Sequence, residues 1–159
     1  MSVDFAFIDS GTGGLPYMCY LNEKCPSASC IYVADAQNFP YGEKSTDEIC
    51  TCVTQLCEKI ISRFSPKVIV LACNTMSVTA LSVLRSKFDV PFIGTVPAIK
   101  LASSITKNKK IGLLATRRSV SENYTLKLIN DFASDCQVFS RGDGELISFI
   151  EHNLTTATE

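Results

Sequence analysis

Cys73 is the residue whose position most favours chemistry. It follows the apolar run 68–72, whose β-branched side chains are typical of a strand buried on both faces of a parallel sheet. From Met76 onward the apolar residues recur at helical spacing, so Cys73 is predicted where a strand ends and a helix begins. Ligands bind at that edge of open α/β sheets, and a nearby helix N-terminus favours the thiolate.

Core packing is the alternative explanation for this cysteine. Free cysteine is among the most buried residue types, and the chain has eight. Cys50, Cys52 and Cys57 are close in sequence but lack the second ligand pair of a closed zinc site, and the single histidine is His152. We therefore expect no metal site, and expect Cys50 and Cys57 on the buried face of a helix.

A carboxylate and a hydroxyl follow the first predicted strand, residues 3–8. Asp9 and Ser10 precede a turn with three glycines in four residues, 11–14, which allows a close backbone approach to a ligand. The turn is not the dinucleotide fingerprint, because Pro16 stands where the third glycine would be, and no P-loop lysine follows. A carboxylate at the end of a buried strand is costly without a partner or a function.

Strands and helices alternate along the rest of the chain. This pattern predicts one α/β domain over residues 1–159, an open doubly wound parallel sheet with helices on both faces. A capping box, Ser45 with Glu48, predicts the start of a long helix ending near residue 64. The predicted strand ends converge on one edge of one sheet and carry Asp9-Ser10, Asp35, Cys73-Asn74-Thr75, Gly94 and Thr116.

Composition excludes several classes of protein. The chain has 159 residues, 46% of them hydrophobic, and a net charge of -1 without a basic run, so electrostatic binding to nucleic acid is not expected. No apolar stretch is long enough to cross a membrane, and the N-terminus does not resemble a signal peptide. Eight reduced thiols then indicate a cytoplasmic protein.

The residues at the predicted strand ends favour acid–base chemistry. A cysteine protease or amidase would need a histidine beside Cys73, and His152 is in the last predicted helix. A thiolate with a nearby carboxylate can instead accept and return a proton.

Several motifs resemble those of bacterial glutamate racemases, in the aspartate/glutamate racemase family. The resemblance covers essentially the whole chain in the right order. The matching segments are residues 8–15 (IDSGTGGL), 32–35 (YVAD), 39–42 (FPYG), 72–75 (ACNT), 96–100 (VPAIK) and 113–116 (LLAT).

The resemblance implies a cofactor-independent isomerase that interconverts L- and D-glutamate and supplies D-glutamate for peptidoglycan, and hence for cell-wall biogenesis and cell shape. In such enzymes two cysteines face opposite sides of the α-carbon. Cys73 matches the first, Asp9 would assist it, and Glu151 matches a glutamate on the side of the second. The residues implied in substrate binding are Asp9, Ser10, Tyr41, Gly42, Asn74, Thr75, Thr116 and Ser119.

The chain also departs from the family pattern. Family members continue into a second part with a Cys-Thr-His motif, which this sequence lacks. Arg118 and Ser119 stand where glycine and threonine are usual. We therefore expect a truncated or split racemase domain that is inactive alone, whose partner is a missing second half or a second copy. An aspartate racemase, or a non-catalytic remnant that binds an amino acid or a protein partner, are the alternatives.

Overall fold

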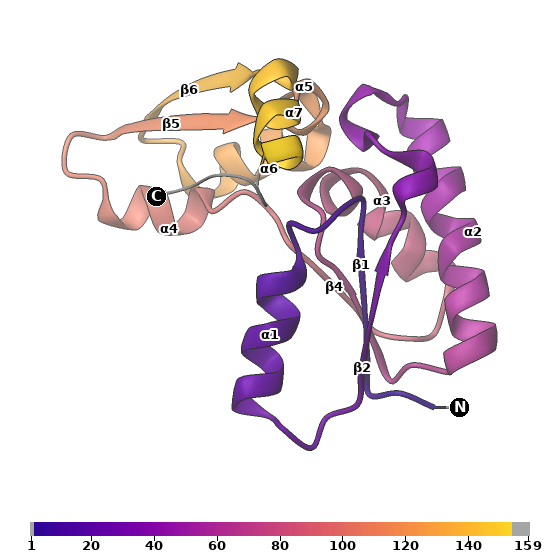
Figure 1. Ribbon diagram of the computed structural model, residues 1–159. Coiled ribbons are helices and arrows are strands. Elements are labelled where there is room, and N and C mark those ends of the chain that lie inside the picture. The colour runs from indigo at the N-terminus through magenta and orange to yellow at the C-terminus, as the bar shows by residue number, and fades with distance from the viewer. Residues whose placement is uncertain (1, 154–159) are drawn as a thin grey trace. The chain divides into compact units, whose positions relative to one another are not determined.

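The computed structural model describes residues 2–153, and for residues 151 and 152 the backbone alone. The chain divides into two compact units, Met1–Thr95 and Val96–Glu159, called here the first and the second unit (Figure 1). In the described residues, the helices are too short or too polar to span a bilayer.

The first unit is built on a four-stranded parallel sheet in the order β2-β1-β3-β4. Asp9 lies beside Ala34, and Leu71 beside Gly94, so the carboxyl ends of the strands meet at one edge. This register places the polar residues after β1, β2 and β3 close together, as the sequence predicted. The strands are β1 (Phe5–Asp9), β2 (Cys30–Ala34), β3 (Val68–Leu71) and β4 (Phe92–Gly94).

Helices cover both faces of this sheet (Figure 1). Successive residues of β1 and β3 point to opposite faces. Phe7 and Val70 pack with Met18 and Leu21 of α1 (Leu15–Lys24). The other face packs against α2 (Thr46–Phe64) and α3 (Asn74–Lys87) in a core that includes Ile8, Ile69, Leu71, Ile49, Val53, Cys57, Met76 and Leu84. The predicted doubly wound arrangement is confirmed in this unit.

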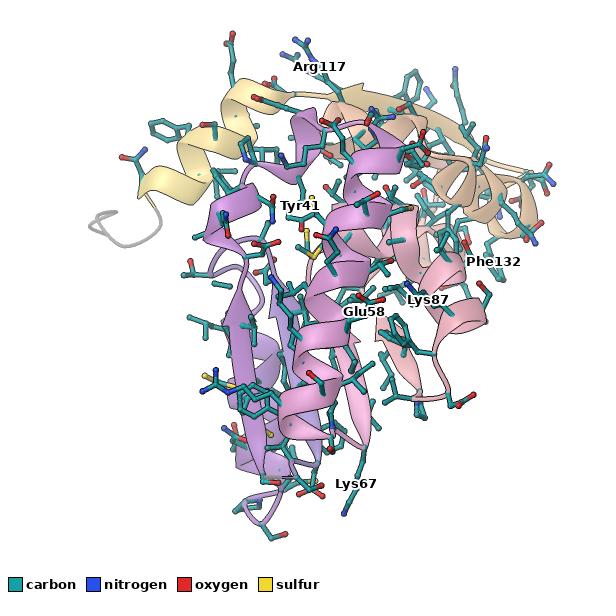
Figure 2. All side chains as sticks on the ribbon, turned by 90° about the vertical axis from the view of Figure 1, so that its right-hand side faces the viewer. Tyr41, Glu58, Lys67, Lys87, Arg117 and Phe132 are labelled. Carbon is teal, nitrogen blue, oxygen red and sulfur yellow. The ribbon has the colours of Figure 1, made fainter. Side chains whose placement is uncertain are left out.

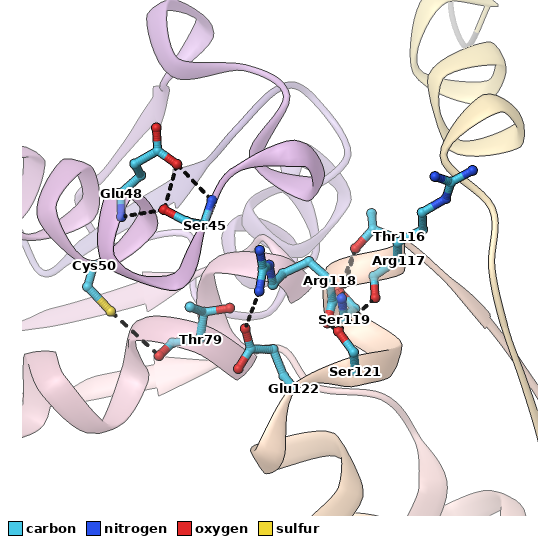
Figure 3. A network of polar contacts seen from close by, with 10 residues as sticks. All are labelled: Ser45, Glu48, Cys50, Thr79, Thr116, Arg117, Arg118, Ser119, Ser121 and Glu122. Atoms are coloured by element: carbon cyan, nitrogen blue, oxygen red, sulfur yellow. Dashed lines mark hydrogen bonds and ion pairs between the residues drawn. The ribbon is translucent and has the colours of Figure 1, made fainter.

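Local sequence signals set the ends of α2. The Ser45 hydroxyl accepts a hydrogen bond from the backbone N–H of Glu48, whose carboxylate accepts one from the Ser45 backbone N–H (Figure 3). The helix ends at Ser65, which adopts a left-handed conformation with φ 40°. An ion pair of 2.7 Å between Glu58 and Lys87 joins α2 to α3 (Figure 2).

The second unit has a two-stranded parallel sheet and a smaller core. β5 (Lys110–Ala115) pairs with β6 (Gln137–Gly142), and Ile111 lies beside Val138. The buried core residues are Ile99, Ile111 and Ala133. The helices of this unit are α4 (Ile99–Ile105), α5 (Arg117–Ser121), α6 (Asn123–Phe132) and α7 (Gly144–Asn153).

The prediction of one sheet is wrong for these last strands. β5 hydrogen-bonds to β6 and belongs to a separate sheet, so Thr116 does not follow a strand of the Asp9 and Cys73 sheet. The alternation of strands and helices identifies parallel strands but does not specify which strands pair. In this unit α5 and α6 are separate helices, because Glu122 has the extended ψ of 140° between them.

Candidate active site

Cys73 lies at the junction of β3 and α3, where the sequence predicted it. It is the N-cap residue of α3, in an extended conformation, and only 9% of its surface is exposed. Its Sγ lies 3.6 Å from the Oγ of Ser10, which follows β1. The ends of two adjacent strands therefore bring a thiol and a hydroxyl into contact.

Asp9 is buried next to this pair and its carboxylate is held by three donors. One oxygen accepts a hydrogen bond of 2.7 Å from the backbone N–H of Ser10. The other accepts one of 2.7 Å from the backbone N–H of Gly14 and one of 2.8 Å from the hydroxyl of Tyr32. Asp9 thus has the partners that a carboxylate at a buried strand end requires. Together with Ser10 it forms a continuous polar path to Cys73.

Gly14 is needed for the close approach of the turn to the sheet. A Cβ at this position would lie 2.4 Å from the Cβ of Ala72 and 3.2 Å from the Asp9 carboxylate. Its φ of -85° is open to any residue, so the requirement is one of space. The glycine turn therefore approaches Asp9 and β3 of its own sheet.

The pKa of the Cys73 thiol is raised in this site. Burial has the largest effect, and the negative charge of Asp9 raises the pKa further. The backbone amides of Met76 and Thr75 and the Ser10 hydroxyl act in the opposite direction. The predicted effect of the α3 N-terminus is present, but burial outweighs it. The prediction that the helix N-terminus makes the site favour the thiolate is therefore wrong, because burial raises the pKa of Cys73 more than the α3 N-terminus lowers it.

Tyr41 and Gly42 lie in a short 3-10 helix, η2 (Tyr41–Glu43), which follows η1 (Ala36–Asn38). Tyr41 is 1% exposed and donates a 2.6 Å hydrogen bond to Asp35. Burial and this bond raise the pKa of its hydroxyl well above the usual range. The hydroxyl is therefore engaged within the protein, while Gly42 beside it is half-buried.

Asn74 and Thr75 form the first turn of α3, directly after Cys73. The Asn74 side chain is exposed, whereas Thr75 is buried at 4% exposure. Asn74 is thus the more accessible of the two to a ligand at this edge.

The remaining predicted residues belong to the second unit. Thr116 is the N-cap of α5, and its Oγ1 accepts a 3.1 Å hydrogen bond from the Ser119 backbone N–H (Figure 3). The two hydroxyl oxygens are 2.9 Å apart, and Ser119 is buried. Arg118 pairs with Glu122 at 3.7 Å. The backbone of Glu151 lies in α7, and its side chain is outside the described residues.

Tyr32 and Asn38 bond to the buried carboxylates but are not among the site residues predicted from the sequence. Tyr32 lies beside Phe7 on the strand next to Asp9, within reach of the carboxylate. Finding it requires knowing that β2 and β1 pair. The Asn38 side-chain nitrogen donates to both oxygens of Asp35. In the sequence, Asn38 follows a strand by four residues and cannot be told apart from an ordinary loop asparagine.

The other thiols are spread over the chain. Cys57 is buried in α2, as predicted, whereas Cys50 is only half-buried. The part of the chain that the structure describes contains no group of three side chains able to hold a metal ion.

Comparison with known proteins identifies the family. Residues 19–144 match the family described as Asp/Glu/Hydantoin racemase. The chain belongs to this family. It is 44% identical over 155 residues to the glutamate racemase of Treponema pallidum (strain Nichols), and 44% identical over 147 residues to that of Proteus mirabilis. These alignments cover 98% and 92% of the chain but only 58% and 51% of the relatives.

Solved structures of glutamate racemases share the fold. The Escherichia coli enzyme, in complex with L-glutamate and the activator UDP-MurNAc-ala, matches with a TM-score of 0.88 at 39% identity. A Bacillus anthracis isoform matches with a TM-score of 0.84 at 29% identity. The matches cover 98% and 96% of this chain, and 59% and 57% of those chains. The chain therefore spans somewhat more than half of the length of its relatives.

Proposed function

We propose that this chain supplies the first-cysteine half of a glutamate racemase active site, a cofactor-independent isomerase site. The observation that supports this most directly is the buried contact of 3.6 Å between Cys73 and Ser10 at the sheet edge. The chain that contains this contact is 44% identical to a glutamate racemase of the same family. In this proposal residues 1–159 act as one domain, and a second part completes the site.

Cys73 exchanges a proton with the substrate α-carbon. As a thiolate it takes the α-proton, the S–H bond forms, and the electron pair left on carbon delocalises into the substrate carboxylate. A donor on the opposite face then protonates the carbon, which inverts it. In the reverse direction the protonated Cys73 is the donor.

The raised pKa of Cys73 must be overcome when the substrate binds. The ammonium group of an amino acid is a positive charge, and a positive charge within about 4–6 Å stabilises a thiolate and lowers its pKa. In this proposal the thiolate forms only with substrate in place, which protects the empty site from oxidation and alkylation.

Asp9 assists by its charge and its fixed position. Three donors hold its carboxylate, which has about four lone-pair sites, so one remains for the substrate ammonium or for a proton. An anion held in this way attracts the ammonium group toward Cys73 without a reorganisation cost.

The remaining predicted residues complete the substrate-binding site. Ser10, Asn74, Thr75 and the Tyr41-Gly42 backbone would bind glutamate at the sheet edge of the first unit. For Thr116, Ser119 and Glu151 we retain the substrate-binding and catalytic roles that the family resemblance implies. The product, D-glutamate, would enter peptidoglycan synthesis in the cytoplasm.

Racemisation tests the proposal. The purified chain is incubated with L- or D-glutamate in deuterated water, and inversion is followed by circular dichroism and α-proton exchange by NMR. We expect no inversion, and at most slow exchange of one enantiomer, because the proton donor for the opposite face is missing. Adding the C-terminal remainder of the Treponema pallidum enzyme should restore inversion. Cys73→Ala should abolish it, whereas Cys57→Ala should retain it.

Thermal melts test ligand binding separately. At a glutamate concentration of about 100 times Kd, binding should stabilise the fold by about 2.7 kcal/mol. A larger shift with aspartate would instead assign an aspartate racemase. Absence of a shift with either amino acid, together with failure to restore inversion, would favour the non-catalytic remnant. Full racemisation by the chain alone would contradict the two-thiol account.

A further inference from the structure

A polar cluster with a buried carboxylate and a buried tyrosine at its centre lies in the turn between β2 and α2. It consists of Asp35, Asn38, Tyr41 and Cys52. We propose that Asp35 is a positioning residue that holds Tyr41, and with it the backbone at Gly42, against Cys73. The inference deepens the proposed function, since it assigns a role to a residue outside the expected set of substrate contacts.

The Asp35 carboxylate is directed into the protein. Its residue is 8% exposed. One oxygen accepts the 2.6 Å bond from the Tyr41 hydroxyl, and the two oxygens lie 3.1 and 2.9 Å from the side-chain nitrogen of Asn38. Hydrogen bonds to a charged acceptor are stronger than those between neutral groups, and their geometry is more restricted. The carboxylate therefore fixes the position of both donors.

The backbone of Asp35 is tied to the active-site strand. Its N–H donates a 2.8 Å hydrogen bond to the carbonyl oxygen of Asp9. This bond continues the ladder between β2 and β1 by one residue. Asp35 is therefore positioned by the same strand end that positions Asp9 and Ser10.

Tyr41 transmits this position to the thiol. Its ring is 1% exposed and belongs to the same core cluster as Cys73 and Met76. Cys73 also raises the pKa of the Tyr41 hydroxyl electrostatically, as expected for neighbouring groups. Figure 2 shows Tyr41 at the end of the sheet near α2. A loosened Tyr41 would let water reach the sulfur.

A side chain of α2 makes a second hydrogen bond to the cluster. The Cys52 Sγ donates to the side-chain oxygen of Asn38 at 3.4 Å, so Asn38 links the helix to Asp35. The turn is thus held by β2 at one end and by α2 at the other. Within the cluster, the donors to the buried Asp35 carboxylate are neutral groups, so burying its charge costs folding free energy. A role in positioning Tyr41 explains why such a carboxylate is present.

The test is the pH profile of Cys73 alkylation by iodoacetamide, read by mass spectrometry of the peptide that contains Cys73. Besides burial, the backbone amides of Met76 and Thr75, the Asp9 carboxylate and the Ser10 hydroxyl act on the pKa of Cys73. Tyr32 and Tyr41 also interact with the thiol electrostatically. All of these groups remain in Asp35→Ala. We expect its half-maximal pH to fall by about 1 unit, because admitting water removes part of a burial effect that can reach 3–5 units. Tyr41→Phe should shift the profile in the same direction, and the double variant should add little to either.

The controls separate positioning from general destabilisation. Cys57→Ala removes a buried group of the same unit outside the turn and should leave the Cys73 profile unchanged. Asp35→Asn retains one acceptor oxygen and should restore part of the wild-type profile. A wild-type profile in folded Asp35→Ala would overturn the proposal. If Asp35→Ala does not fold, Tyr41→Phe decides, and an unchanged profile there overturns it.

Alkylation requires no substrate, so the outcome is independent of the proposed function. A shifted profile without any stabilisation by glutamate would support the positioning role and contradict the racemase half-site. An unshifted profile with clear glutamate binding would do the reverse. A shift in Asp35→Ala without one in Tyr41→Phe would also overturn the proposal, because Asp35 would then act through another group.

Discussion

The two units of this chain differ in how completely they bury their apolar surface. In the first unit, helices cover both faces of a four-stranded sheet, and Ile8, Ile69 and Leu71 are fully buried. In the second unit a two-stranded sheet leaves Leu114 and Phe139 exposed at 52% and 53%. Other large apolar residues exposed in the second unit are Leu101, Ile105, Leu126, Phe132, Leu146, Phe149 and Ile150.

This difference shows where a preorganised site can form. A sheet that is packed on both faces holds Ser10 in contact with both Asp9 and Cys73. The Ser10 backbone N–H bonds to the Asp9 carboxylate, and the Ser10 hydroxyl lies 3.6 Å from the Cys73 sulfur. A two-stranded sheet is at best marginally stable without further packing. We therefore expect the first unit to fix the reactive thiol and the second to be the softer part of the chain.

The largest difference is expected for leucine truncation. Leu71→Ala removes a fully buried side chain from β3 and should cost about 2–5 kcal/mol of unfolding free energy. Leu114→Ala, on the exposed face of β5, should change it by no more than about 0.5 kcal/mol. Urea unfolding measures both. Equal costs would show that Leu114 is buried in solution and would remove the contrast between the units.

Glycine substitution should give opposite signs in the two units. Gly14→Ala forces a Cβ against Ala72 at 2.4 Å and should cost about 1–3 kcal/mol. Gly112→Ala in β5 meets no atom within 4 Å and should stabilise by about 0.5–1 kcal/mol, because alanine loses less backbone entropy on folding. Thermal melts give the sign directly. A neutral Gly14→Ala would mean that the turn can move away from β3.

Stability should fall at alkaline pH, mainly through the first unit. Burial raises the pKa of Cys57 from 9.0 to about 12, so the folded state holds this proton more tightly than the unfolded state. The stabilisation is complete below pH 9 and is lost as pH rises toward 12. At pH 10 the loss is about 1.4 kcal/mol. Cys57→Ala should flatten the decline between pH 8 and 11, whereas Cys136→Ala, in the second unit, should change the slope less. Equal slopes in wild type and Cys57→Ala would contradict this assignment.

The sequence by itself determined most of the local structure and the place of the thiol. Three predicted features are set by residues close together in the sequence, and the structure contains each of them. They are the apolar strand before Cys73, the capping box of Ser45 and Glu48, and the polar residues at the strand ends. Parallel strands end at the same edge, so Asp9, Ser10 and Cys73 could be expected together before any pairing was known.

Only the tertiary structure decided which strands pair and how deeply Cys73 is buried. Apolar runs do not specify their partners, so the separate β5–β6 sheet could not be read from alternation. The balance at Cys73 between burial and the α3 N-terminus depends on atoms from distant segments, and burial prevails. The bonds from Tyr32 to Asp9 and from Tyr41 to Asp35 exist only because the first unit folds as it does, since hydrogen bonds of side chains depend on distances that local sequence does not set.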